Sequence, residues 1–223
     1  QAPITSRGCP YQCIYCAAPC LDQHRVRFHS VGRVVEEIAA LRRDHAVDYL
    51  FFHDSVFTLN RRRTIDLCQE VIERGLVTPF SCQTRVDHLD LELLLQLRSA
   101  GCQHILLGIE SGSEESLRRM RKQVTLDTVR QAVRQVKEAG IHSTGFFMIG
   151  FPWEDREMML QTADVAQHLG LDAVTLFSVT PLPGSELWSM CPEVPMPGSV
   201  DFRDPEVNLT RMPDGEYIAL YQQ

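Results

Sequence analysis

The chain has 223 residues, of which 44% are hydrophobic, and this length allows one substantial buried core. Its 22 basic and 29 acidic side chains give a formal charge of −7 without a long basic run, which argues against nucleic acid as a partner. No apolar run approaches the ~20 residues that span a bilayer, and the first residues lack a charged-then-apolar leader. A cytoplasmic protein without a membrane span is therefore expected.

Apolar runs alternate with amphipathic segments along most of the chain. The apolar runs predict strands near residues 2–6, 48–53, 79–85, 103–109, 141–149 and 172–179. A helix is expected after each of the first five strands, because apolar residues there recur at helical spacing. Four of these helices are predicted to end at a glycine in the left-handed conformation, namely Gly75, Gly101, Gly140 and Gly170.

Strand–helix alternation with short connections predicts an α/β fold built from right-handed crossover units. Six units are too few to close an eight-stranded barrel, so we expect an open, incomplete (β/α)6 barrel with parallel strands over residues 1–180. A flat doubly wound sheet is the alternative. Residues 181–223 are rich in Pro and Gly and predict an irregular segment with a short helix at 214–221, at the edge of the same domain. Because the chain opens on Gln1 almost directly in a strand, removal of a preceding domain or peptide is also an expectation.

The loop after the first predicted strand carries Cys9, Cys13 and Cys16, closely followed by Cys20. A disulfide, a zinc site and an iron–sulfur cluster are the possible uses of such thiols. Clustered cysteines in a reducing compartment more often bind metal, and no second pair with zinc-ligand spacing follows. Three thiolates can hold three irons of a [4Fe–4S] cube and leave the fourth iron open. Cys20 is interpreted as a loop or core thiol, and three further cysteines as core residues: Cys68, Cys82 and Cys102.

The stretch "RGCPYQCIYC" resembles the C-x₃-C-x-Φ-C signature of radical S-adenosylmethionine enzymes, with Tyr15 at the aromatic position. This resemblance implies a [4Fe–4S] cluster bound by Cys9, Cys13 and Cys16, with S-adenosylmethionine on the open iron. It further implies cleavage of that cofactor to a 5′-deoxyadenosyl radical, which abstracts hydrogen from a substrate. An electron donor of the flavodoxin or ferredoxin type is expected, and the substrate is a small molecule or is carried by a partner protein.

Later segments resemble the branch of this superfamily that is associated with cobalamin-binding domains. "FFHDSV" places Asp54 at a strand end, where the resemblance implies contact with the amino group of S-adenosylmethionine; a cap of the next loop is the equal alternative. Gln83 and Arg85 end the third predicted strand, and both are predicted to bind the cofactor. Arg85 is expected to bind a carboxylate of the cofactor, with a structural ion pair to Asp87 as the alternative.

Two further segments extend the predicted cofactor site. In "GIESGSEESLRRMRK" the resemblance assigns Glu110 and Ser111 to the ribose or the methionyl group, and Lys122 to the carboxylate of the cofactor, with Arg121 as a substitute. "GFFMIGFPWED" is similar to a family segment ending in G-x-P-G-E-T, and it places Gly150 on the adenine side.

A radical enzyme is the leading interpretation of these motifs. If cobalamin in a domain outside this chain takes part, the reaction is a methylation, a rearrangement or an oxidation. A methylthiotransferase-like radical enzyme and a non-catalytic zinc-binding scaffold are the alternatives.

Overall fold

A computed structural model describes residues 2–194 and 207–222 of the chain. Five parallel strands form one sheet in the order β3-β4-β5-β6-β7, so that each strand pairs with the next one in sequence. These strands are β3 (Leu50–Phe52), β4 (Phe80–Arg85), β5 (Cys102–Glu110), β6 (His142–Ile149) and β7 (Ala173–Ser178). All five fall within two residues of the predicted boundaries, and the α/β class with a parallel sheet is confirmed.

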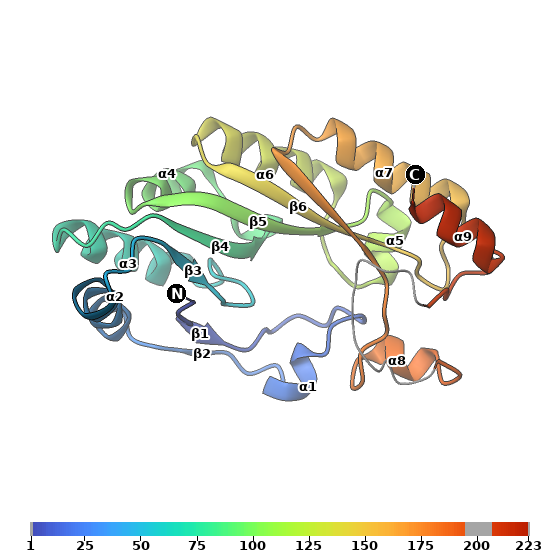
Figure 1. Cartoon of the computed structure of the whole chain (residues 1–223), viewed down its shortest axis with the longest axis horizontal. Helices are drawn as coiled ribbons and strands as arrows, with labels where there is room; N and C mark the ends of the chain where they lie inside the picture. Colours follow the sequence, from blue (N-terminus) through green and yellow to red (C-terminus); the bar gives the residue numbers. More distant parts are fainter. Residues whose placement is uncertain (1, 195–206, 223) are drawn as a thin grey trace.

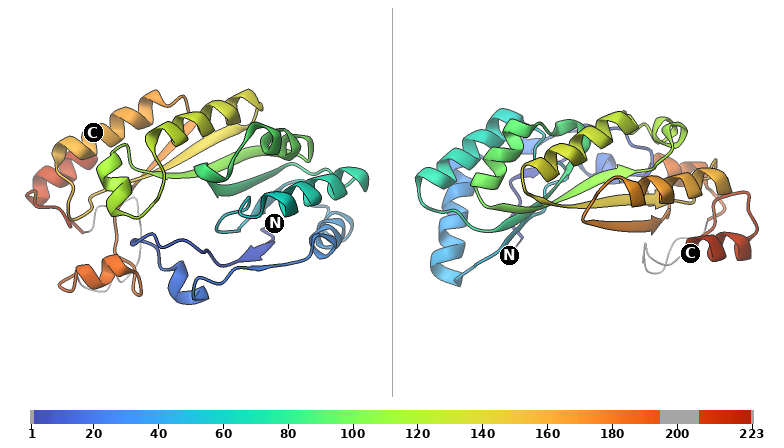
Figure 2. Two further views of the ribbon diagram at one scale, coloured as in Figure 1. Left: turned by 180° about the vertical axis from the view of Figure 1, so that it is seen from behind. Right: turned by 90° about the horizontal axis from the view of Figure 1, so that it is seen from above.

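The helices between the strands cover one face of this sheet. They are α2 (Val31–His45), α3 (Arg61–Glu73), α4 (Leu91–Ser99), α5 (Glu114–Arg119), α6 (Leu126–Glu138) and α7 (Arg156–His168). In Figures 1 and 2, α4, α6 and α7 lie on one side of the sheet, and the N-terminal segment lies on the other. Each of the six begins at a side chain that accepts a hydrogen bond from the backbone N–H three residues on: Ser30, Asn60, Asp90, Ser113, Thr125 and Asp155.

The predicted glycines at the helix ends all have positive φ angles, between 66° and 109°. The requirement is strictest at Gly101, where a Cβ would collide with the carbonyl oxygen of Thr78. At this position only glycine permits both the left-handed backbone and the close approach of the two chain segments.

The first predicted strand differs from the expectation. Only Ser6–Arg7 forms a strand, β1, which pairs antiparallel with β2 (Arg27–Phe28) in a separate ribbon. The preceding residues still run beside β3, since the carbonyl of Pro3 accepts a hydrogen bond of 3.0 Å from His53 N. Pro3 has no N–H to return, and the N–H of Thr5 binds a side chain, the carboxylate of Asp54, instead of a backbone carbonyl. The backbone pairing therefore stops, and among residues 2–194 and 207–222 the sheet has five strands where six were predicted.

The main core lies between the sheet and its helices, and it includes Cys68, Cys82 and Cys102 as predicted. After β7 the chain forms α8 (Glu186–Met190) and α9 (Asp214–Tyr221), the second at the predicted place. Helix α9 packs on the sheet through Tyr217, which is fully buried and hydrogen-bonded to Ser178. Part of the predicted irregular segment, residues 195–206, lies outside the described residues. None of the helices in the described ranges is long and apolar enough to cross a membrane.

Candidate active site

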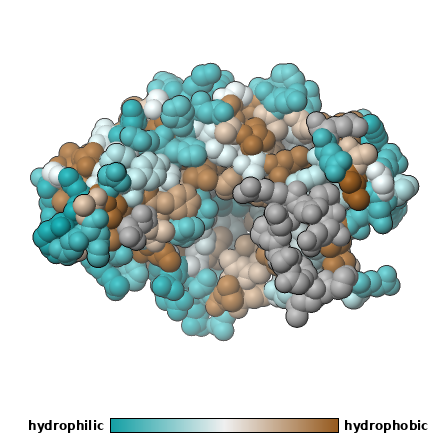
Figure 3. Space-filling model, viewed as in Figure 1, coloured by the Kyte–Doolittle hydropathy of each residue, from teal (hydrophilic) through white to brown (hydrophobic). Residues whose placement is uncertain are grey.

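A cleft of about 290 Å³ lies between the N-terminal loop and the open face of the sheet, close to the lower end of the range usual for ligand sites. The molecule is visibly hollowed in the middle of the face shown in Figure 3. One wall is the cysteine loop, which contributes Cys9, Tyr11, Cys13, Tyr15 and Cys16. The facing wall comes from β4, β5, β6 and the segment after α5, and it contributes Gln83, Arg85, Leu106, Gly108, Glu110, Lys122 and Phe146.

Backbone hydrogen bonds fix the cysteine loop from two sides. The N–H of Ile14 donates to the carbonyl of Met120 over 3.1 Å, and the carbonyl of Ile14 accepts from Leu187 N over 2.8 Å. The side chain of Ile14 is 4% exposed. The loop is therefore held between the end of α5 and the start of α8, with the three cysteines facing the same cleft.

The donor set of this loop fits an iron–sulfur cluster. Burial raises the pKa of the Cys9 and Cys16 thiols, so metal binding must displace their protons. Within the described ranges, no three His, Cys, Asp or Glu side chains are grouped so as to hold a single metal ion. A four-iron cube instead takes its thiolates at separate corners, and three soft sulfur ligands around one cleft satisfy that arrangement.

Glu110 and Lys122 form a nearly buried ion pair in the cleft. Their Oε1 and Nζ atoms are 2.8 Å apart, and the two side chains are 12% and 4% exposed. Glu110 has a φ angle of 79°, and the register between β5 and β6 shifts between Gly108 and Glu110. The carboxylate lies on the cleft side together with Leu106 and Gly108. Strain of this kind in a non-glycine residue is typical of functional sites.

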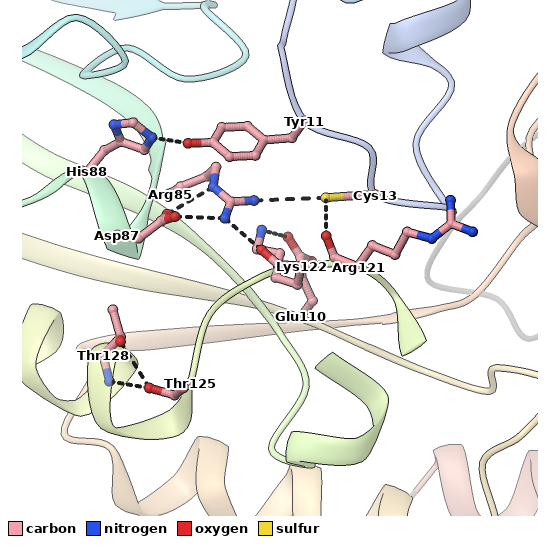
Figure 4. Close-up of polar contacts among 10 residues, drawn as sticks. All are labelled: Tyr11, Cys13, Arg85, Asp87, His88, Glu110, Arg121, Lys122, Thr125 and Thr128. Carbon is pink, nitrogen blue, oxygen red and sulfur yellow. Dashed lines mark hydrogen bonds and ion pairs between the residues drawn. The ribbon is translucent and has the colours of Figure 1, made fainter. Parts of the chain in front are cut away.

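Arg85 lies beside the cysteine loop, in contact with several groups (Figure 4). Its guanidinium pairs with Asp87, as the structural alternative proposed, and its Nη1 is also 3.9 Å from Cys13 Sγ. The ring of Tyr11 covers the guanidinium, with the centroid 3.7 Å from Cζ. Arg85 therefore forms the ion pair with Asp87 and also lines the cleft.

Tyr15 and Gln83 line the cleft as expected. The ring of Tyr15 packs edge-on against Phe151, with the ring centroids 6.2 Å apart. Burial, followed by the nearby charges of Glu110, Cys13 and Cys16, raises the pKa of Tyr15 well above its usual range. The phenol is therefore neutral and able to donate a hydrogen bond at any physiological pH.

Three predicted cofactor residues are not among those that line the cleft. Asp54 is fully buried and accepts hydrogen bonds from Thr5 and Ser6, so its carboxylate caps the N-terminal segment and not the next loop. Ser111 hydrogen-bonds to Thr162 and accepts from Ser113 N. Gly150 donates to Glu154, and a Cβ there would collide with the Tyr217 hydroxyl. In the structure these residues support the site by holding its walls.

Other residues of the cleft were missed by sequence reasoning. Tyr11 lies between the first two cysteines, and its place in the loop is the signal that could have revealed it. Leu106 and Gly108 precede Glu110 at a spacing of two, the period at which strand residues share a face. Asp87 and His88 lie in a 3₁₀ turn after β4, outside the cleft lining; Asp87 was expected as the ion-pair partner of Arg85, whereas His88 has no comparable sequence signal.

Residues 4–166 match the radical SAM superfamily. The chain belongs to this superfamily. Members use a [4Fe–4S] cluster and S-adenosylmethionine, in agreement with the cysteine motif and with the cleft. The family is one of enzymes, and this argues against the alternative of a non-catalytic zinc scaffold.

Several known proteins resemble the chain over most of its length. An uncharacterized methyltransferase of Pyrococcus horikoshii is 35% identical over 185 residues, which are 83% of this chain and 40% of that protein. The anaerobic magnesium-protoporphyrin IX monomethyl ester cyclase of Rubrivivax gelatinosus is 30% identical over 83% of this chain and 34% of its own length. The chain thus spans well under half of these relatives.

Among solved structures, the radical S-adenosylmethionine methyltransferase TsrM of Kitasatospora setae, with cobalamin and a [4Fe–4S] cluster bound, has a TM-score of 0.79. It is 20% identical, and the match covers 86% of this chain and 36% of TsrM. This likeness confirms the open partial barrel that the sequence predicted. TsrM thus binds the cobalamin that the resemblance implied for this branch of the superfamily.

Proposed function

We propose that this chain is the catalytic core of a radical SAM enzyme whose [4Fe–4S] cluster is held by Cys9, Cys13 and Cys16. The observation that carries the proposal is the meeting of these thiols with the Glu110–Lys122 pair in one cleft. When bound, the cluster supplies the electron that splits S-adenosylmethionine into methionine and a 5′-deoxyadenosyl radical, which removes a hydrogen atom from the substrate.

The ion pair supplies complementary charges for the methionyl end of the cofactor. Lys122 Nζ can donate to the carboxylate of the cofactor, and Glu110 can accept from its ammonium group or from a ribose hydroxyl. Each side chain neutralises the other before the cofactor arrives, so neither charge is left buried and unpaired. We propose that binding exchanges these partners without a large desolvation cost. Gln83, also in the cleft, carries an amide that can donate and accept.

The remaining walls of the cleft suit the containment of a radical. Val56, Leu106 and Phe146 provide apolar surface there, which keeps water away from the reacting atoms. Orientation and exclusion of this kind are the contribution that a protein makes when a cofactor carries the chemistry.

The overall reaction is proposed from the relatives, which include a methyltransferase and a cyclase. We propose a cobalamin-dependent methylation or rearrangement of a small-molecule or partner-borne substrate, with the cobalamin bound outside this chain. A flavodoxin- or ferredoxin-type protein would deliver the electron. A methylthiotransferase-like reaction is the alternative, and it differs in transferring sulfur together with the methyl group.

Anaerobic reconstitution of the chain with iron and sulfide tests the cluster assignment. We expect a brown protein with about four irons that produces 5′-deoxyadenosine when it is reduced with S-adenosylmethionine, and no such product from Cys13→Ala. Cys20→Ala is the matched control, because Cys20 is exposed in α1 (Ala18–Asp22) and does not line the cleft. Loss of the cluster in the Cys20 variant, or a wild-type protein that retains zinc and makes no product, would contradict the proposal.

A second variant tests the ion pair separately. Glu110→Gln keeps the shape of the side chain but removes its charge. We expect full iron content and at least ~10-fold weaker binding of S-adenosylmethionine, since loss of one charged hydrogen bond corresponds to about 1.5 kcal/mol or more. Unchanged binding would show that Glu110 does not contact the cofactor.

A further inference from the structure

The guanidinium of Arg85 is already occupied along the edge that would grip a carboxylate. Its Nε and Nη2 donate to the two oxygens of Asp87 at 2.9 and 2.8 Å. Nη2 also donates to the carbonyl of Lys122 at 2.6 Å. Arg85 is only 4% exposed, while the side chain of Asp87 is 26% exposed. The Nε and Nη2 edge of Arg85, which could bind a carboxylate in bidentate fashion, therefore binds groups of the protein itself. This disfavours the expected contact of Arg85 with a carboxylate of the cofactor.

The remaining terminal nitrogen of Arg85 faces the cysteine loop. Nη1 lies 3.9 Å from Cys13 Sγ, within reach of a hydrogen bond to sulfur. The ring of Tyr11 lies over the guanidinium, with its centroid 3.7 Å from Cζ. The hydroxyl of Tyr11 is in turn hydrogen-bonded to the ring of His88, whose pKa is lowered by burial. The cation is thus fixed by an ion pair on one edge and an aromatic ring on one face.

We propose that Arg85 is a positioning residue that raises the reduction potential of the cluster by donating a charged hydrogen bond to the thiolate of Cys13. The inference rests on the proposed function, because it concerns the cluster which that function requires. Reduction adds one electron from an external low-potential donor, while the bonds and protons of Arg85 stay unchanged. The added negative charge is stabilised by a cation at a ligand sulfur, and hydrogen bonds to such sulfurs are a known determinant of cluster potentials.

Asp87 determines how much of this charge the sulfur experiences. It binds the Nε and Nη2 edge, whereas Cys13 lies at Nη1. The positive end of the Arg85–Asp87 pair is therefore directed at the cluster ligand. Removal of Arg85 and removal of the charge on Asp87 should consequently shift the potential in opposite directions. A purely structural role of the pair would not give opposite signs.

A redox titration of the reconstituted chain, followed by electron paramagnetic resonance without S-adenosylmethionine, tests this inference. For Arg85→Met we expect the reduction equilibrium to become about 10-fold less favourable, equivalent to about −59 mV for a one-electron couple. Asp87→Asn should shift the potential upward. Arg118→Met is the matched control, because this exposed cation of α5 pairs with Glu115 at the surface and does not line the cleft. Its potential should remain that of the wild type.

The outcomes separate this inference from the proposed function. A wild-type chain that assembles no cluster overturns both. A cluster whose potential is the same in the wild type, Arg85→Met and Asp87→Asn overturns only the inference. If Arg85→Met does not assemble a cluster, the reduction potentials of Arg85→Lys and Asp87→Asn still test the inference. Lysine keeps the positive charge but loses the planar, bidentate guanidinium, so the cluster potential of Arg85→Lys should lie below that of the wild type. Shifts of the same sign in the Arg85 and Asp87 variants also refute the proposal.

Discussion

Replacement of Asp54 by alanine distinguishes a structural carboxylate from a cofactor ligand. Asp54 is fully buried and accepts hydrogen bonds from the N–H of Thr5 at 3.0 Å, the Thr5 hydroxyl at 2.8 Å and the Ser6 hydroxyl. Each bond to a charged acceptor contributes ~1.5–3 kcal/mol, and the two hydroxyls can rotate toward other acceptors. We therefore expect Asp54→Ala to lower the free energy of unfolding by about 3–5 kcal/mol.

Thermal and chemical denaturation measure this loss, which for a domain of this size corresponds to a decrease in Tm of roughly 10 °C. Asp54→Asn keeps one acceptor oxygen and should lose less. Asp66→Ala, an exposed aspartate of α3, is the control and should stay within about 0.5 kcal/mol of the wild type. Molecules of Asp54→Ala that still hold a cluster should bind S-adenosylmethionine as the wild type does. A variant with normal stability but without cofactor binding would refute this reasoning.

Two further predictions concern the cleft and its support. In Gly108→Ala the new Cβ would lie 2.7 Å from Glu110 Oε1 and 3.0 Å from Lys122 Nζ, which are the ends of flexible side chains. We expect the fold to persist and titration calorimetry to show ~10-fold weaker cofactor binding, which corresponds to ~1.4 kcal/mol. Gly32→Ala is the control and should leave binding unchanged, because there is open space around Gly32. Equal binding of the cofactor by both variants would contradict the prediction. Burial raises the pKa of Glu154. The contribution of Glu154 to the free energy of unfolding is therefore fully present below its usual pKa of 4.5, and it is lost as the pH rises through the raised pKa of the folded state. Urea denaturation above pH 4.5 should therefore show a smaller decrease in stability with pH for Glu154→Gln than for the wild type, and identical slopes would disprove the assignment.

Local sequence patterns were sufficient for the regular elements. The five sheet strands were predicted because each is a short apolar run bounded by a helix end and a polar loop. The helix ends at Gly75, Gly101, Gly140 and Gly170 were predictable because a left-handed residue is a property of the local backbone. The first strand was not predictable in the same way. In that segment the N–H of Thr5 donates its hydrogen bond to the side chain of Asp54, 49 residues away in the sequence, and not to the backbone of a neighbouring strand.

The site shows the same division between local and long-range determinants. The sequence by itself determined the three-cysteine loop and the family, because the spacing of the thiols is a local property of one segment. Only the tertiary structure decided that Glu110 pairs with Lys122 in the cleft and that Arg85 directs one nitrogen at Cys13 while its other nitrogens bind Asp87. These relations depend on the register between strands and on contacts across 72 residues of chain, which are set by packing and cannot be read from neighbouring residues.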